Sequence, residues 1–583
     1  MTGDTDTPAP AGSATALAVL VVLVVVSPWA FGSVDPRAMQ AIAIVSLAAA
    51  LGALAWDIRR GTAQPAPIAL WPIAGLWLLA AFQLTPLPEP LQRLIAPGSA
   101  AVWHPEAPAA AAVLGHGPRP ISLNPEATRR SLAFATGLLA LALVAAKALR
   151  ERRALRRASI AIVAGGVAVA LYGLVARLVF TNKLYGIWSV PTTAPFGPFV
   201  NKNHFAGYVV LSALLAVGLA AGLASEARRG PGFLSWIESS RARFVVVAWG
   251  AAAILILAVP VCLSRGGVVS LTAGLVAFAG LRLWSRRDSR LAPRGLVGLA
   301  GGAALLLAAL VYVLPAEARD RVLTLAGVTS DQSGSYRLAV WRDTGHLARS
   351  SPWVGSGFGG FEDALTRFKT AAGQLAVEHA ENDYLELLAE GGIVALGLVA
   401  ALAALALTRG LRGAASHGDR LARGLATGAA AGLVAIAVHS AFDFNLRIPS
   451  NALLCVALVA FVLALPASGT SRTPRLLVPF LLLVTLAVAL LTPRAAPRVD
   501  PGPMLRAAHS ADASLRRAGL EADLISHLQR RPADAAAWLA LAWLRVPMSR
   551  AEASALAEWA VELDPASQAV RGARSRLGAS TTR

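Results

Sequence analysis

The segment VEHAENDYLELLAEGGIVALGL, residues 377–398, changes from polar to apolar in the space of a few helical turns. Its first half carries a histidine, an asparagine and several carboxylates, and from Gly391 onward the chain continues as an apolar run to about residue 408. A run of about 20 apolar residues is typical of a transmembrane helix. Three interpretations of the polar half are open: a metal site, a helix cap, or a proton-handling site at a membrane surface.

Similar apolar runs recur along the chain and decide the fold class. Of the 583 residues, 56% are hydrophobic and only 15% are charged, whereas a soluble chain is about a quarter charged. We therefore predict an all-α, polytopic transmembrane helical bundle of about 13 spans. The spans are expected near residues 14–32, 38–56, 66–84, 131–149, 158–179, 204–225, 243–263, 267–284, 295–315, 383–408, 421–442, 451–466 and 475–492.

The basic residues predict how the chain is oriented in the membrane. Short arginine clusters, such as Arg152 and Arg153, follow every even-numbered span, and they account for most of the net charge of +20. Cytoplasmic loops carry the Lys/Arg excess, so we expect the N-terminus inside and the tail outside. The N-terminal segment lacks a basic start and a small-residue cleavage site, so its apolar part is interpreted as a retained span. Topology explains the positive charge better than nucleic-acid binding does.

The same reasoning divides the chain into four regions. Residues 1–130 hold the first spans and an outward loop, and 131–466 form the central membrane domain. Residues 467–492 contain the last span, and 493–583 form an extracytoplasmic α-helical tail. In that tail, Pro532 and Pro565 lie about one tetratricopeptide repeat apart. A pair of ordinary amphipathic helices is the alternative, and either version is expected to dock on the membrane domain or on a partner.

The outward loops hold the polar motifs, and they converge on one side of the predicted membrane. These motifs end the loop at 180–203, form the CLSRGG turn at 262–267, fill the large loop at 316–382, and follow the eleventh span at 439–451. The GSGFGG motif at 355–360 lacks the βαβ context of a nucleotide site, so we interpret it as a flexible turn whose N–H groups could help to hold a phosphate.

Titratable residues at these loops suggest chemistry on an anionic substrate. Asn382 or Asp383 is expected to cap the tenth span, with Glu386 in its first turn. His379, beside these carboxylates, has the side chain of a general base. The paired cysteines of a zinc deaminase are absent, and so is HExxH, so no metal site is predicted.

Four cationic residues are candidates for binding a pyrophosphate. Arg265 lies in the tight turn between two spans, where a cation needs a partner. Residues 335–350 are expected to form an amphipathic helix on the membrane surface, anchored by Tyr336, Val340, Trp341 and Leu347. This helix would carry Arg337 and Arg342 at headgroup height. Lys202, with His204, begins the sixth span; interfacial anchoring is the alternative role for all of these residues.

These motifs together resemble the O-antigen ligase/polymerase superfamily of bacterial inner-membrane glycosyltransferases. The resemblance covers most of residues 130–465. It is carried by GPFVNKNHFAGY (197–208), SRGG (264–267), YRLAVWRDTGHLARSSPWVGSGFGGF (336–361), HAENDYLELLAEGG (379–392) and HSAFDFNLRIPSNALL (439–454).

The resemblance implies roles for individual residues. Arg265 and Arg337, helped by Arg342 and Lys202, would bind the donor pyrophosphate, and a histidine at the head of the following span would activate the acceptor. The family has His directly before Asn, whereas here Glu381 precedes Asn382 and His379 lies two residues upstream. Either Glu381 is the base, or His379 is the base and Glu381 orients it. The supporting residues would be His204, Asn382, Asp383, His439, Asp443 and Asn445.

The resemblance also implies a reaction and a place in the cell. A glycan would pass from undecaprenyl diphosphate to an acceptor hydroxyl at the periplasmic face of the inner membrane, with inversion and with no metal or cofactor. The acceptor could be a glycan, a lipid A core or a protein, and the tail could bind a protein partner. A flippase for lipid-linked sugars is the alternative, and a plain membrane anchor would leave the outward arginines and histidine without a purpose.

Overall fold

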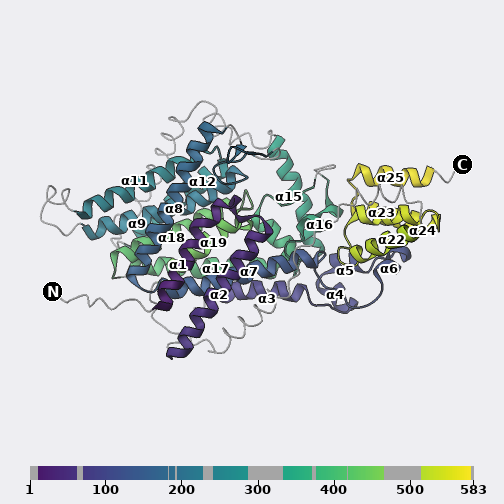
Figure 1. The fold of residues 1–583 in the computed structure, drawn as a ribbon, viewed down its shortest axis with the longest axis horizontal. Coiled ribbons are helices and arrows are strands. Elements are labelled where there is room, and N and C mark those ends of the chain that lie inside the picture. The colour runs from purple at the N-terminus through teal and green to yellow at the C-terminus, as the bar shows by residue number, and fades with distance from the viewer. Residues whose placement is uncertain are drawn as a thin grey trace. The chain divides into compact units, whose positions relative to one another are not determined.

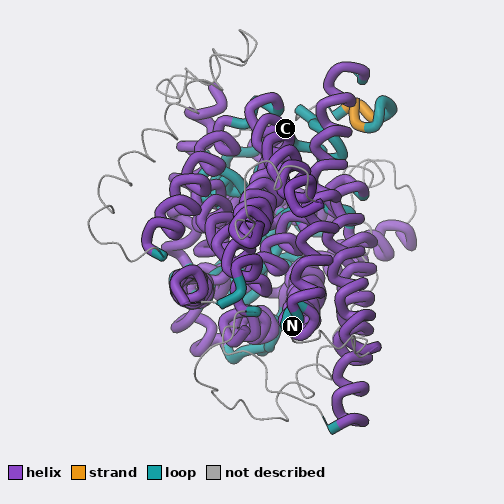
Figure 2. The backbone as a smooth tube through the Cα atoms, turned by 90° about the vertical axis from the view of Figure 1, so that its left-hand side faces the viewer, coloured by secondary structure: helices purple, strands orange, loops and turns teal. Residues whose placement is uncertain are grey.

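The computed structural model describes residues 11–61, 70–180, 183–190, 194–227, 240–285, 332–370, 376–416, 418–464 and 514–579. Within these ranges helices joined by loops make up the structure, and the only strands are those of one hairpin, β1 (Lys183–Leu184) and β2 (Trp188–Ser189), as Figure 2 shows. The all-α prediction is therefore confirmed. The chain forms two compact units, each made from three stretches of sequence.

Eight described helices are long and apolar enough to cross a membrane. They are α2 (Pro36–Arg60), α7 (Pro125–Ala148), α8 (Arg152–Val179), α9 (Lys202–Ala227), α11 (Ser240–Val261), α12 (Arg265–Trp284), α17 (Asp383–Ser416) and α18 (Arg420–His439). Three more predicted spans appear as shorter apolar helices: α1 (Ala11–Val26), α3 (Trp71–Gln83) and α19 (Pro449–Leu463). The predicted spans at 295–315 and 475–492 lie outside the described residues, so the polytopic character is confirmed and the number thirteen stays a prediction.

Unit 1 comprises residues 1–74, 133–327 and 400–490 and is built around α9. This helix packs against α18, α11 and α8, which lie beside it in Figure 1. A Cβ on Gly218 would lie 2.6 Å from the carbonyl oxygen of Gly424, and one on Gly428 would lie 2.8 Å from the Cα of Gly218. Small residues spaced by four let the α9 and α18 backbones touch, which is how membrane helices gain packing energy without a hydrophobic driving force.

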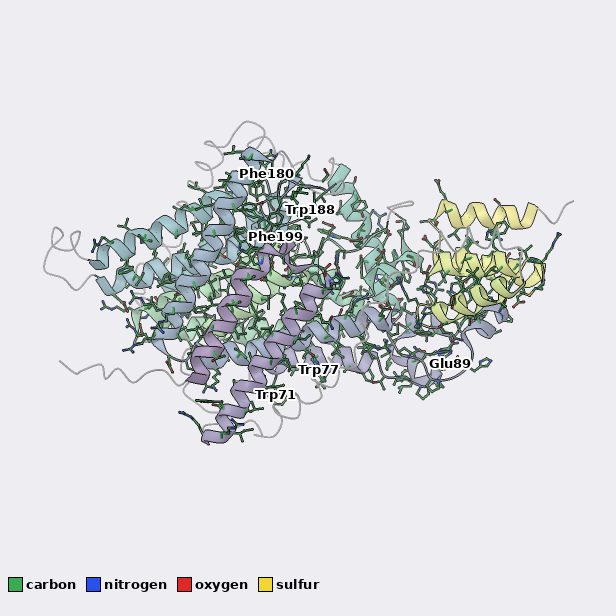
Figure 3. All side chains as sticks on the ribbon, viewed as in Figure 1. Trp71, Trp77, Glu89, Phe180, Trp188 and Phe199 are labelled. Atoms are coloured by element: carbon green, nitrogen blue, oxygen red, sulfur yellow. The ribbon has the colours of Figure 1, made fainter. Side chains whose placement is uncertain are left out.

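The two ends of unit 1 differ in chemistry. At one end Arg152, at the start of α8, contacts Glu226 near the end of α9 and Asp419 before α18. The opposite ends of α8, α9 and α18 carry aromatic and amide side chains. There the Phe31 ring lies 5.3 Å from Trp188, and Figure 3 shows Phe180, Trp188 and Phe199 grouped near the hairpin. The predicted separation of basic loops from polar motif loops is thus present within this unit.

Unit 2 comprises residues 75–132, 328–399 and 491–583. Its helices are most of α3, α4 (Glu89–Ile95), α5 (Pro97–Trp103), α6 (Pro108–Leu114), the start of α7, α15 (Gln332–Ser350), α16 (Phe361–Leu365), the start of α17, α22 (Ser514–Leu528), α23 (Ala535–Arg545), α24 (Arg550–Leu563) and α25 (Gln568–Ala579). Each tail helix packs on the next, and α22 and α24 also contact α6 (Figure 1). The tail therefore docks inside unit 2, whereas its tetratricopeptide character stays a prediction.

One hydrophobic core joins the three stretches of unit 2. Trp103, Val340, Val377, Ala380 and Trp538 are all buried within it. Val340 and Leu347 had been expected to anchor α15 to a membrane surface, but they are only 1% and 2% exposed, because they face this core. The helix at 335–350 is confirmed, and its assignment to a lipid surface through these two residues is wrong.

Candidate functional site

The first polar group lies in unit 2, where α15 meets the segment before α17. Arg337 on α15 donates from Nη2 to Oε2 of Glu381 at 2.9 Å, and both side chains are partly exposed. Burial raises the pKa of Tyr336, next to Arg337 in sequence, and the Glu381 carboxylate raises it further. Arg337, Tyr336 and Glu381 therefore form one partly buried polar cluster, in which the guanidinium offsets the Glu381 charge.

A second pair lies in the same segment and joins His379 to the first turns of α17. The Nδ1 atom of His379 lies 2.9 Å from Oε1 of Glu386, and the other oxygen of Glu386 accepts the N–H of Ala380 at 2.8 Å. The Glu386 side chain is 1% exposed, whereas that of His379 is 33% exposed. An ionised carboxylate only accepts hydrogen bonds, so with Glu386 ionised the shared proton lies on Nδ1, and Nε2 of the neutral imidazole then carries the lone pair. This is the tautomer that a general base requires.

Asn382 sets the start of α17. Its Oδ1 accepts the N–H groups of Tyr384 and Leu385 at 3.0 and 3.1 Å, so the predicted cap is Asn382. Asp383 is the buried first residue of the helix. Glu381, immediately before the cap, has a φ of 55°, a left-handed conformation that costs about 1–3 kcal/mol in a residue other than glycine. Backbone strain thus coincides with the segment that carries His379.

The GSGFGG loop closes around α17 and does not present free N–H groups. Gly357 donates to the carbonyl of Glu390, and Gly359 donates to the Glu390 carboxylate at 2.8 Å. The backbone N–H groups of the other four residues also bind protein acceptors, among them Oε1 of Gln83. The expectation that this loop could hold a phosphate through its backbone is therefore wrong; it holds the helix instead.

The second polar group lies in unit 1, at the end with the aromatic side chains. Nε2 of His204 lies 3.3 Å from Oδ1 of Asp443, and both side chains are buried. The other Asp443 oxygen accepts from the side chain of Asn203 at 2.6 Å. The His204 ring also contacts the Phe444 ring edge to face, with 4.7 Å between centroids. Asp443 therefore ties the loop after α18 to the first turn of α9.

Amides continue this network toward α19. Asn451 donates to Oδ1 of Asn445 at 2.9 Å and to the carbonyl of His204 at 3.0 Å. Gly207 allows this close approach, because a Cβ there would lie 2.1 Å from the Asn445 side-chain oxygen. The predicted supporting residues His204, Asp443 and Asn445 thus lie together.

The cations predicted in this unit lie at the same end. Ser264 caps α12 by accepting the N–H of Gly267 at 3.1 Å, which places Arg265 in the first turn of the helix. A Cβ on the next residue, Gly266, would lie 3.1 Å from the ring of His439. A Cβ on Gly267 would lie 2.6 Å from the Cβ of Ala206, so the first turn of α12 packs against the first turns of α9, the helix that begins at Lys202.

The predicted site residues therefore fall into two groups. Unit 2 brings together Arg337, His379, Glu381, Asn382 and Asp383, while unit 1 brings together Lys202, His204, Arg265, His439, Asp443 and Asn445. A single site made from both groups stays a prediction. Arg342 is exposed on α15, and because residues five apart on a helix are about 140° apart, it does not share a face with Arg337.

Sequence reasoning did not identify Glu386 as the partner of His379. A carboxylate in the first turn of a helix is explained equally well by the helix dipole. The only other sequence feature that links Glu386 to His379 is that both lie on the same short segment. Among the described residues, no group of three or more His, Cys, Asp or Glu side chains is placed to hold a metal ion.

A comparison with known protein families identifies one segment of the chain. Residues 250–400 match the model of a family described as O-antigen ligase, a segment that contains Arg265, Arg337 and His379. The resemblance noted from the sequence motifs is thereby confirmed over residues 250–400. No curated protein matches the chain.

Proposed function

With an O-antigen ligase domain at residues 250–400 as the premise, we propose that this protein transfers a glycan from undecaprenyl diphosphate to an acceptor hydroxyl at the periplasmic face of the bacterial inner membrane. The family supports a membrane glycosyltransferase of the ligase or polymerase type. The donor, the acceptor class and the side of the membrane are parts of the proposal.

The observation that carries the proposal is the pairing of His379 with the buried Glu386. A carboxylate that fixes the tautomer and orientation of an imidazole is the arrangement used by His general bases. Glu381, the alternative base, is instead paired with Arg337. We therefore assign proton removal to His379, and we assign to Glu381 the orientation of Arg337.

The reaction then follows from the chemistry of these groups. Nε2 of His379 takes the proton from the acceptor hydroxyl, and the oxygen attacks the anomeric carbon of the donor sugar. The bond from that carbon to the diphosphate oxygen breaks, which releases undecaprenyl diphosphate and inverts the anomeric centre. Arg337 and Arg265, with Lys202, offset the charge that develops on the leaving group.

The distribution of charge along the spans fits an enzyme that transfers a glycan at the membrane surface better than a transporter that moves a lipid-linked sugar across the membrane. In the eight long apolar helices, charged side chains lie toward the helix ends, as with Lys202 in α9 and Arg265 in α12. A flippase needs charged or polar groups along its path at mid-membrane. The distribution of charge therefore favours chemistry at the rim of the bilayer.

The test is reconstitution of the purified protein with an undecaprenyl-diphosphate oligosaccharide, with and without candidate acceptors. The expected result is acceptor-dependent product and released undecaprenyl diphosphate, both lost in Arg265→Ala and Arg337→Ala at unchanged protein level. Exposed Arg571 on α25 supplies the control Arg571→Ala, which should transfer at the wild-type rate. Full transfer by either of the first two variants would remove the pyrophosphate role from that arginine.

A further inference from the structure

A cavity of about 530 Å³ lies within unit 2, apart from the residues assigned to catalysis. Its walls come from the loop at 84–86, the start of α7, Gly359, and the turn between α22 and α23. It thus draws on all three stretches of the unit, including the docked tail. Its size is that of a small-molecule site.

The lining is strongly cationic. Five arginines face the cavity, against the three carboxylates of Glu126, Glu362 and Asp363. The arginines are Arg119, Arg129, Arg130, Arg530 and Arg531.

Two of the three carboxylates are already paired with lining arginines. Glu126 accepts from Arg130 at 3.0 Å, and Asp363 forms an ion pair with Arg531. Asp363 also accepts from Asn124 at 2.5 Å. These pairs neutralise two arginines and leave an excess of positive charge on the rest of the wall.

The remaining three arginines have no ion pair among the described residues. Arg119 donates to the backbone carbonyl of Leu114 and lies over the Trp103 ring, 5.4 Å from its centroid. Arg129 and Arg530 are exposed at the cavity, one from α7 and one from the turn after α22. Guanidinium groups that come from separate elements and line one cavity are suited to bind carboxylate or phosphate oxygens through charge-assisted hydrogen bonds.

The start of α7 adds a second source of positive electrostatic potential at the cavity. Asn124 caps this helix by accepting the N–H of Ala127 at 3.0 Å, and Asn124, Pro125 and Glu126 line the cavity. The positive end of the α7 dipole therefore lies at the cavity wall. Both the helix end and the arginines favour an anion.

We propose that this cavity binds an acidic saccharide, meaning a sugar that carries a carboxylate or a phosphate, as part of the acceptor or of the growing glycan. The anionic character follows from the arginines. The saccharide character rests on the proposed function and on a lining that mixes polar and apolar side chains, where Gln529 and Glu362 supply donors and acceptors for hydroxyl groups and Trp103 supplies an aromatic surface.

The test is calorimetric titration of the full chain in detergent at low salt with three probes. Trigalacturonate presents carboxylates, mannose 6-phosphate presents a phosphate, and maltotriose is neutral. At least one acidic probe should bind ten times more tightly than maltotriose, and its affinity should fall as salt is raised. Equal binding of maltotriose, or no binding of either acidic probe, would overturn the proposal.

Matched variants locate the binding. Arg129→Gln and Arg530→Gln change exposed side chains, so the fold should persist, and each should weaken the acidic probe about tenfold, the value of one charge-assisted hydrogen bond. Arg571→Gln, on the exposed face of α25, should leave the affinity unchanged. Equal losses in Arg571→Gln, or a loss in Arg337→Ala alone, would place the ligand elsewhere.

The two proposals can fail separately. Transfer from undecaprenyl diphosphate with no acidic-saccharide binding would remove the cavity proposal and leave the catalytic one. Binding that depends on Arg129 and Arg530, together with no transfer from any carrier, would remove the proposed reaction and leave the binding site.

Discussion

Replacing Glu386 with glutamine tests whether His379 is a base oriented by a buried carboxylate. Glu386 accepts two hydrogen bonds, one from Nδ1 of His379 at 2.9 Å and one from the N–H of Ala380 at 2.8 Å. A glutamine side chain has one acceptor oxygen and one NH₂ donor, so it cannot accept both. Either the imidazole adopts the tautomer with Nε2 protonated, or the buried N–H of Ala380 loses its partner.

The two consequences have different magnitudes. Loss of one hydrogen bond to a charged group should destabilise the protein by about 1.5–3 kcal/mol. If the imidazole changes tautomer, base catalysis is lost, and this contributes about 10²–10⁴ in rate. A fall of that size corresponds to about 2.7–5.4 kcal/mol in the activation free energy.

Glu390 provides the matched control, one helical turn further along α17. It is equally buried, and its Oε1 accepts the N–H groups of Gly359 and Phe361 at 2.8 and 3.3 Å, two partners that are both backbone groups. In Glu390→Gln the single amide oxygen can still accept both N–H groups, so this variant should lower the unfolding temperature less than Glu386→Gln, and turnover by the folded protein should stay within a few-fold of wild type.

The assay is single-turnover transfer from an undecaprenyl-diphosphate oligosaccharide, normalised to folded protein by thermal unfolding of the same sample. The reasoning is refuted if Glu386→Gln and Glu390→Gln retain the same rate. In that case the carboxylate beside His379 acts only on stability, and the base must be sought elsewhere.

Three further predictions concern the fold. Gly392 kinks α17 with φ 65° and ψ −167°, and a Cβ there would lie 2.3 Å from the backbone of Trp353. Gly392→Ala should therefore destabilise the protein by about 1–3 kcal/mol or more. An unchanged midpoint of thermal unfolding would contradict this role of the glycine. Gly218→Val should separate α9 from α18 and lower the unfolding midpoint, whereas Gly250→Val, which meets no atom within 4 Å at its Cβ, is the control expected to have little effect. Burial lowers the pKa of His104 below its ordinary 6.5. As the pH falls below 6.5 the unfolded chain therefore takes up a proton on this histidine before the folded chain does, and the folded state loses stability. The contribution of His104 to the free energy of unfolding is complete only above pH 6.5. Unfolding midpoints measured from pH 7.5 to 5.5 should fall less steeply in His104→Gln, and parallel curves would rule out this origin.

Much of the fold follows from simple physical patterns in the sequence. Apolar runs of about 20 residues predict the long helices, because a membrane requires every backbone hydrogen bond to be made within a helix. The cap at Asn382 was likewise predictable, since its side chain competes for the first N–H groups of a helix. The shared location of His204, Asp443 and Asn445 follows from connectivity, as each lies at the same end of neighbouring helices.

The details of the candidate site depend on tertiary contacts that no local pattern contains. The choice of Glu386 as the His379 partner depends on how residues 379–381 turn back over α17, through a left-handed Glu381. The glycines at 355–360 suggested a phosphate loop, but their N–H groups bind Glu390 and Gln83, which are distant in sequence. The burial of Val340 required a core supplied partly by the tail.

The shared core of unit 2 has a consequence for biosynthesis. Val377 and Ala380, on either side of His379, are buried in the same cluster as Trp538 and Trp559 of the tail. The ribosome makes those tryptophans only near the end of translation, long after the first spans have left the tunnel. We therefore expect the segment that carries His379 to reach its final packing only after the tail has been made, and we expect a chain truncated before α23 to leave Val377 and Ala380 without part of their core.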